Sequence, residues 1–94
     1  MKMTRHANVF DALEDDVGVA ENLKIRAQLM NELSYYIERH NLTQARAGEL
    51  FEVGQPRISD LVRGKIERFT IDMLVNMLAR TGKQIDVKIK SEAA

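Results

Sequence analysis

The central part of this sequence is the run TQARAGELFEVGQPRISDLVRG, residues 43–64. It predicts two short helices joined by a tight turn. The second helix begins with polar side chains and ends at a glycine flanked by cations. The major groove of DNA admits one helix, and side chains near the N-terminal end of that helix contact the base edges. The run is therefore typical of a helix-turn-helix that binds DNA.

Local signals define both helices of this motif. Thr43 is the expected N-cap of a first helix that runs to Leu50 or Phe51. Pro56 suits the first turn of the second helix because no backbone N–H is needed there, and Gly64 ends that helix. The side chains expected to face inward are Ala47, Leu50 and Phe51 of the first helix and Ile58, Leu61 and Val62 of the second.

Further helices are expected on both sides of the motif. Residues 20–39 carry apolar side chains at three- and four-residue spacing. Asn41 is a plausible stop for this helix because Asn tolerates the left-handed conformation of a helix end. Thr70 is the expected N-cap of a last helix that stops at Gly82. A short acidic helix over residues 8–16 would bring the total to five.

The C-terminal residues show a different period. In residues 84–90, apolar and polar side chains alternate, which is the pattern of a half-buried β-strand. A single strand in an otherwise helical chain must pair with a second copy, with another protein, or with nothing. The predicted organisation is an N-terminal acidic extension (1–19), a helix-turn-helix domain (20–82) and a C-terminal strand and tail (83–94).

The composition is that of one small globular domain. The chain has 94 residues, of which 45% are apolar and 30% charged, and it has no cysteine. No apolar run is long enough to span a membrane, and the first residues lack the apolar stretch of a signal peptide, so we expect a cytoplasmic protein. No grouping of side chains predicts an enzyme, a cofactor site or a metal site, and His6 and His40 are far apart in the sequence.

The net charge is zero but is unevenly distributed. Residues 1–40 carry five Lys or Arg against seven Asp or Glu, whereas residues 41–90 carry nine against six. A cationic C-terminal half is a modest indication of phosphate contact. The acidic stretch at residues 11–16 is most simply a solvated surface, although it could also bind a basic protein.

The ordered set of motifs resembles the XRE family of helix-turn-helix regulators, the group of the lambda-type phage repressors and Cro. The features that carry the resemblance are Thr-Gln at 43–44 and Gln-Pro-Arg-Ile-Ser at 55–59. Leu-Val-Arg-Gly-Lys at 61–65 and RFTIDMLVNML at 68–78 are similar to the small HigA-type antitoxin branch. The resemblance implies an all-α, five-helix lambda-repressor-like DNA-binding domain with a short N-terminal helical element and a C-terminal β-strand.

The resemblance also implies DNA-binding roles for particular residues. Gln44 would bond a backbone phosphate. Five residues of the second motif helix would face the groove, namely Gln55, Pro56, Arg57, Ser59 and Asp60. Beyond that helix, Arg63, Lys65 and Arg68 would bind phosphates and set the register. Gln can hold an adenine edge and Arg a guanine edge. Asp60 could accept from cytosine or orient Arg57 or Arg63 through an ion pair. The candidate DNA-binding residues are Gln44, Gln55, Pro56, Arg57, Ser59, Asp60, Arg63, Lys65 and Arg68.

Three positions depart from the family pattern. Gly48 stands where the family usually has Ala, at the close approach of the two motif helices, and costs about 1 kcal/mol of helix propensity. Glu52 stands at the turn position usually filled by Gly, which predicts either a left-handed non-glycine residue or a reshaped turn. Arg46 occupies the place where Glu would complete a capping box with Thr43.

The sequence therefore predicts a sequence-specific transcriptional repressor that binds duplex DNA as a homodimer, with the last helix and the strand as candidate dimer contacts. The sharper version is an antitoxin that neutralises a toxin protein and represses its own operon. The alternatives are a free-standing XRE-type repressor, and a protein-interaction module in which the DNA-binding motif is vestigial.

Overall fold

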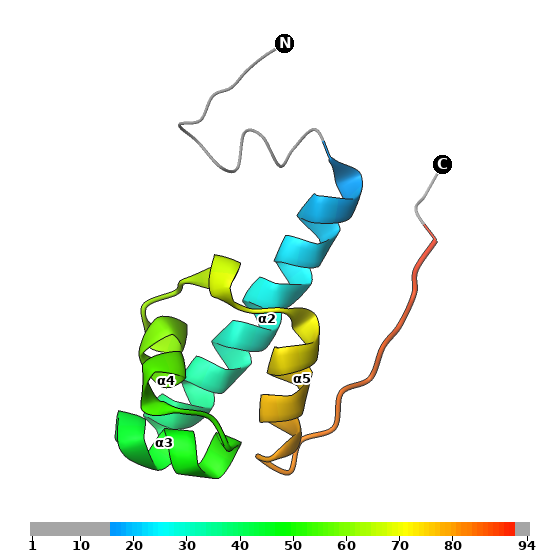
Figure 1. Ribbon diagram of the computed structural model, residues 1–94. Coiled ribbons are helices and arrows are strands. Elements are labelled where there is room, and N and C mark those ends of the chain that lie inside the picture. The colour runs from blue at the N-terminus through cyan, green and yellow to red at the C-terminus, as the bar shows by residue number, and fades with distance from the viewer. Residues whose placement is uncertain (1–15, 92–94) are drawn as a thin grey trace, which may run out of the picture.

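The structure, a computed structural model, describes residues 16–91, which form four α-helices and one 3-10 turn (Figure 1). The long helix α2 crosses the whole molecule, and its N-terminal half extends beyond the other helices. The short helices α3, α4 and α5 lie around its C-terminal half. The elements are α2 (Val17–Arg39), α3 (Gln44–Phe51), α4 (Gln55–Val62), η1 (Ile66–Arg68) and α5 (Ile71–Ala79).

Side-chain caps begin three of the helices. The Thr43 hydroxyl accepts a hydrogen bond from the Arg46 N–H at 3.1 Å, and the Thr70 hydroxyl accepts one from the Met73 N–H at 3.2 Å. Both predicted N-caps are confirmed. Asp16 caps α2 in the same way, so this helix begins at Val17 and not at residue 20 as predicted.

The helix ends also follow local rules. At the end of α2, Asn41 is left-handed with φ 53°, and the Leu42 N–H donates to the carbonyl of Ile37 at 3.0 Å. At the end of α4, Gly64 has φ 73°, and the Lys65 N–H donates to the carbonyl of Asp60 at 3.0 Å. Both are Schellman-type ends, in which a left-handed residue lets the chain turn back and satisfy the last carbonyls. The predicted stops are confirmed.

A single apolar core joins all four helices. α2 packs mainly on α5, and α3 packs mainly on α4. The core side chains of all four helices are almost completely removed from water, and burial of apolar surface is the main stabilising term of a domain of this size. The largest fully buried side chains are Phe51, Phe69, Leu33, Ile58, Leu61, Leu74 and Met77.

Two fold predictions are not confirmed. The described residues contain four of the five expected α-helices, and the fifth was expected over residues 8–16, of which 8–15 lie outside the described residues. The expected C-terminal β-strand is not a strand in the described residues, since the chain after α5 is extended but has no partner to pair with. A strand is defined by hydrogen bonds to a neighbour, and alternation alone does not supply one.

Candidate nucleic-acid interface

Helices α3 and α4 form a helix-turn-helix joined by residues 52–54. The turn is tight because Gly48 allows it. The Val53 N–H donates to the Gly48 carbonyl at 2.9 Å, and a Cβ on residue 48 would lie only 2.8 Å from the Val53 carbonyl oxygen. Cβ atoms essentially never lie this close to a backbone atom, so a side chain at residue 48 would force the turn to shift. Gly48 is therefore required by the close approach of the turn, and the predicted departure from Ala has a steric reason.

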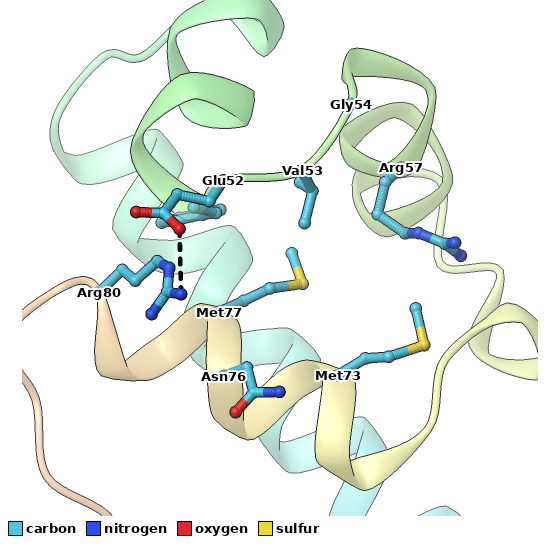
Figure 2. Close-up of a pocket in the computed structure, with 9 residues that line it drawn as sticks. Glu52, Val53, Gly54, Arg57, Met73, Asn76, Met77 and Arg80 are labelled. Carbon is cyan, nitrogen blue, oxygen red and sulfur yellow. Dashed lines mark ion pairs between the residues drawn. The ribbon is translucent and has the colours of Figure 1, made fainter.

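Glu52 adopts the left-handed conformation, with φ 62° and ψ 45°. Of the two outcomes expected at this position, the structure has the left-handed non-glycine residue, a backbone region that costs energy for a residue with a side chain. The Glu52 carboxylate forms an ion pair with Arg80, the C-cap residue of α5, at 3.0 Å (Figure 2). The Glu52 side chain is 67% exposed and that of Arg80 is 39% exposed, so the pair contributes little energy, about 0.2–1 kcal/mol, and mainly joins the turn to the end of α5.

The outer surface of α4 carries several of the predicted DNA-binding residues. Gln55 and Pro56 are exposed at its first turn, Arg63 is exposed just beyond its last turn, and Ser59 and Asp60 are partly exposed between them. Successive residues of a helix are rotated by about 100°, so these side chains occupy one broad face. The structure thus brings five of the nine candidates together on the surface of this helix.

Val62 was predicted to face the core, and this prediction was wrong, because 44% of the residue is exposed. The buried side of α4 runs through Ile58 and Leu61 and continues towards the half-buried Arg57. Val62 follows Leu61 by one step of about 100° and falls on the opposite flank. It is an apolar side chain at the edge of the exposed face of α4, and the sequence pattern alone did not distinguish it from a core position.

Arg57 occupies a different place from the other residues of α4. Its side chain is directed towards the segment between α4 and α5, where Nη1 donates to the Arg68 carbonyl at 3.0 Å and the guanidinium lies 5.6 Å from the centre of the Phe69 ring. The guanidinium is thus held by a hydrogen bond and a cation–π contact. A role of Arg57 in binding a base remains a prediction, and it requires the side chain to leave these contacts.

Arg57 also borders a pocket between the turn and α5 (Figure 2). The Glu52–Arg80 ion pair lies at one end of this pocket, and the Arg57 side chain points away from that pair. Two methionines, Met73 and Met77, point into the space between them. The pocket lining consists of Phe51, Glu52, Val53, Gly54, Arg57, Met73, Asn76, Met77 and Arg80.

The three cations expected to bind phosphates differ in their surroundings. Arg63 forms no ion pair with any residue in the described part of the chain, and Lys65 is half-buried. Arg68 lies 3.5 Å from the Asp60 carboxylate, whose side chain is only 17% exposed. The ion-pair partner of Asp60 is therefore Arg68, and not Arg57 or Arg63 as the sequence suggested. Asp60 fixes the position of a cation that follows α4.

Arg26 of α2 is a structural residue that the sequence analysis missed. Its Nη1 donates to the carbonyls of Ile66 at 3.0 Å and Phe69 at 3.2 Å. Arg26 and Arg57 thus hold the backbone of residues 66–69 from two different helices. Its position within the apolar pattern of residues 20–39 was the only signal for this role, because the two carbonyls that it holds lie 40 and 43 residues away.

The first motif helix presents the remaining candidate. Gln44 is the first residue of α3 and is half-exposed, and its phosphate contact stays a prediction. Arg46 forms an ion pair with Glu49 on the same helix at 2.7 Å.

No group of three metal-binding side chains occurs within residues 16–91, and none of the described helices could span a membrane.

Comparisons with known proteins agree with this geometry. A solved structure assigned to the XRE family of transcriptional regulators is similar to this chain, with 27% sequence identity and a TM-score of 0.72. The similarity covers 78% of this chain and 82% of the other, and it supports the XRE group predicted from the sequence. No curated protein matches the chain. A family model described as a helix-turn-helix domain matches residues 12–90, and the chain therefore belongs to that helix-turn-helix family.

Proposed function

We propose that this protein is a sequence-specific transcriptional repressor that binds an operator in duplex DNA as a homodimer. The helix-turn-helix family and the similarity to an XRE-family regulator support a DNA-binding regulator of transcription. The observation that carries the proposal is the outer face of α4, where Gln55 and Pro56 are exposed while Ile58 and Leu61 anchor the helix from behind. An anchored helix with an exposed N-terminal end is what the major groove accepts.

In this proposal α4 contacts the bases and the residues around it contact the phosphates. Gln55 can form two hydrogen bonds with an adenine edge, and the ring of Pro56 can touch a thymine methyl group. Phosphates would be bound by Gln44, the first residue of α3, and by Arg63, which directly follows α4. These contacts would fix the position of α4 in the groove. In a two-fold dimer the two copies of α4 would lie about 34 Å apart, one turn of the duplex.

Binding to an operator selected from a random duplex library with the purified protein tests the proposal. Gln55→Ala should weaken binding to the selected operator by about 5- to 150-fold, which corresponds to about 1–3 kcal/mol, because it removes a base contact. Binding to unrelated duplexes should change little. Arg63→Ala should weaken binding to both kinds of duplex alike, because phosphates carry no sequence information.

Lys24→Ala provides the matched control. Lys24 is an exposed cation whose side chain is 70% accessible, and it lies in the half of α2 that extends away from α3 and α4. Its removal should leave operator affinity unchanged. Equal affinities of the wild type, Gln55→Ala and Arg63→Ala for the operator would contradict the proposal.

Within this function we propose the narrower role of an antitoxin, which is supported by the likeness of residues 61–78 to the HigA-type branch. The test is co-expression with the product of the adjacent gene. The full chain should bind that product and relieve its toxicity. A chain that lacks residues 1–15, but keeps the Asp16 cap of α2, should bind it more weakly if the acidic stretch takes part. If the product of the adjacent gene is not toxic and does not bind this protein, the antitoxin role is refuted and the alternative of a free-standing repressor stands.

A further inference from the structure

The segment after α5 is extended, exposed and unpaired within the described residues. It leaves the end of α5 and runs towards the end of the molecule where α2 begins (Figure 1). Residues 84–90 form no backbone hydrogen bond with any other residue from 16 to 91. Exposure rises along its apolar side chains, from 37% at Ile85 to 79% at Val87 and 91% at Ile89. An extended segment with unused backbone donors and acceptors is ready to pair with another strand.

The sequence of this segment is complementary to itself. In antiparallel pairing of two copies centred on Val87, each Asp86 lies opposite a Lys88, and each Ile85 lies opposite an Ile89. Both charged pairs then fall on one face of the ribbon, and all six apolar side chains fall on the other. Neither Asp86 nor Lys88 has an ion-pair partner within the described residues, so both are available for this contact.

Other arrangements are less favourable. Parallel pairing in register places Asp86 opposite Asp86 and Lys88 opposite Lys88, and like charges directly opposite each other are destabilising. Moving the antiparallel centre to Asp86 or Lys88 also brings two like charges together at the centre. Shifting the register by one residue places apolar side chains opposite charged ones and moves them to the other face. The Val87-centred antiparallel register is the one that satisfies both the charges and the apolar side chains.

We propose that residues 84–90 of two copies of this chain pair as an antiparallel two-stranded ribbon with Val87 at the two-fold axis. Such an interface is isologous, as a closed dimer requires. A two-stranded ribbon is marginal by itself, so its apolar face must pack against the two helical bodies. The proposal deepens the homodimer of the proposed function by giving it an orientation and a register.

Single cysteines test the register directly, because the chain has none of its own. Directly opposite residues of an antiparallel pair have Cα atoms about 4.5–5.5 Å apart, within the range of a disulfide. Oxidation of full-length Val87→Cys should therefore give a disulfide-linked dimer. Gln84→Cys alone and Lys90→Cys alone should stay unlinked, since each is about 20 Å from its own copy in this register. A mixture of the two should link to each other.

Charge exchange gives an independent test that does not depend on cysteine chemistry. Asp86→Lys and Lys88→Asp each place two pairs of like charges across the ribbon and should each weaken the dimer roughly tenfold in sedimentation equilibrium. The double variant restores opposite charges and should return the dissociation constant to within about threefold of the wild type. A merely structural role of either residue would give no such recovery.

The outcomes separate this proposal from the proposed function. All of these measurements are made without DNA, so a dimer with the expected crosslinks that fails to bind DNA would refute only the repressor. A chain that stays monomeric at micromolar concentration, or crosslinks through Gln84→Cys or Lys90→Cys alone, would overturn the ribbon. So would a double charge variant that dimerises no better than the single ones.

Discussion

At the scale of single residues, the turn between α3 and α4 departs from the family pattern at two positions, Gly48 and Glu52. The left-handed backbone is carried by Glu52, and the glycine is placed at the close approach to the Val53 carbonyl. A left-handed residue with a side chain costs about 1–2 kcal/mol, and the exposed pair with Arg80 offsets only part of it. The turn therefore depends on the absence of a side chain at residue 48.

Gly48→Ala should lower the free energy of unfolding by about 1 kcal/mol. Alanine gains about 1 kcal/mol of helix propensity, but its Cβ would meet the Val53 carbonyl oxygen, and overpacking against backbone costs about 1–3 kcal/mol. The measurement is urea unfolding followed by circular dichroism.

Gly18→Ala is the matched control. Its Cβ would lie at an ordinary 3.4 Å from the Asp16 carboxylate, so the same substitution in the first turn of α2 should stabilise the protein by up to about 1 kcal/mol. Stabilisation by both substitutions would show that the turn can relax away from residue 48, contrary to the argument above.

At the scale of elements, the segment between α4 and α5 is positioned by side chains from outside it. Arg26 of α2 and Arg57 of α4 donate to its carbonyls, and Asp60 pairs with Arg68. This arrangement fixes where the cations after α4 lie relative to the helix. It also explains why Arg57, the most obvious candidate for a base contact, is engaged within the protein.

Arg26→Ala should destabilise the protein by about 1.5–3 kcal/mol, because it removes a charged donor and leaves two half-buried carbonyls without their partner. Lys24→Ala, which removes an exposed cation and an i,i+3 pair on the same helix, should cost less than about 0.5 kcal/mol. Thermal unfolding of the two variants side by side is the measurement. Equal losses would mean that Arg26 does not hold the segment.

At the scale of the whole molecule, zero net charge hides a charge asymmetry that suits DNA. The cations at residues 63, 65 and 68 follow α4, so the proposed dimer would present six of them, together with the neutral Gln44 to which we assign a phosphate contact. We expect about six to eight phosphates to be neutralised, and a log–log slope of operator affinity against salt near −5 to −7. Titrations from about 50 to 200 mM salt measure this slope, and a flat response would argue against phosphate contact.

Much of the fold could be predicted from the sequence because its signals are local. The Thr43 and Thr70 caps act on N–H groups three residues away, and the left-handed Asn41 and Gly64 act within the same turn. The helices between these signals follow from the spacing of their apolar residues. The position of the first turn of α4 could also be predicted from the sequence, because Gly54 and Pro56 define where that helix begins.

Other properties were decided by contacts between residues far apart in the chain. The position of the Arg57 guanidinium depends on a carbonyl 11 residues later, and that of Arg26 on carbonyls 40 and 43 residues later. The exposure of Val62 depends on which flank of α4 meets its neighbours. The alternating pattern of residues 84–90 specifies a strand only when a partner supplies its hydrogen bonds, because pairing is a property of two segments and not of one.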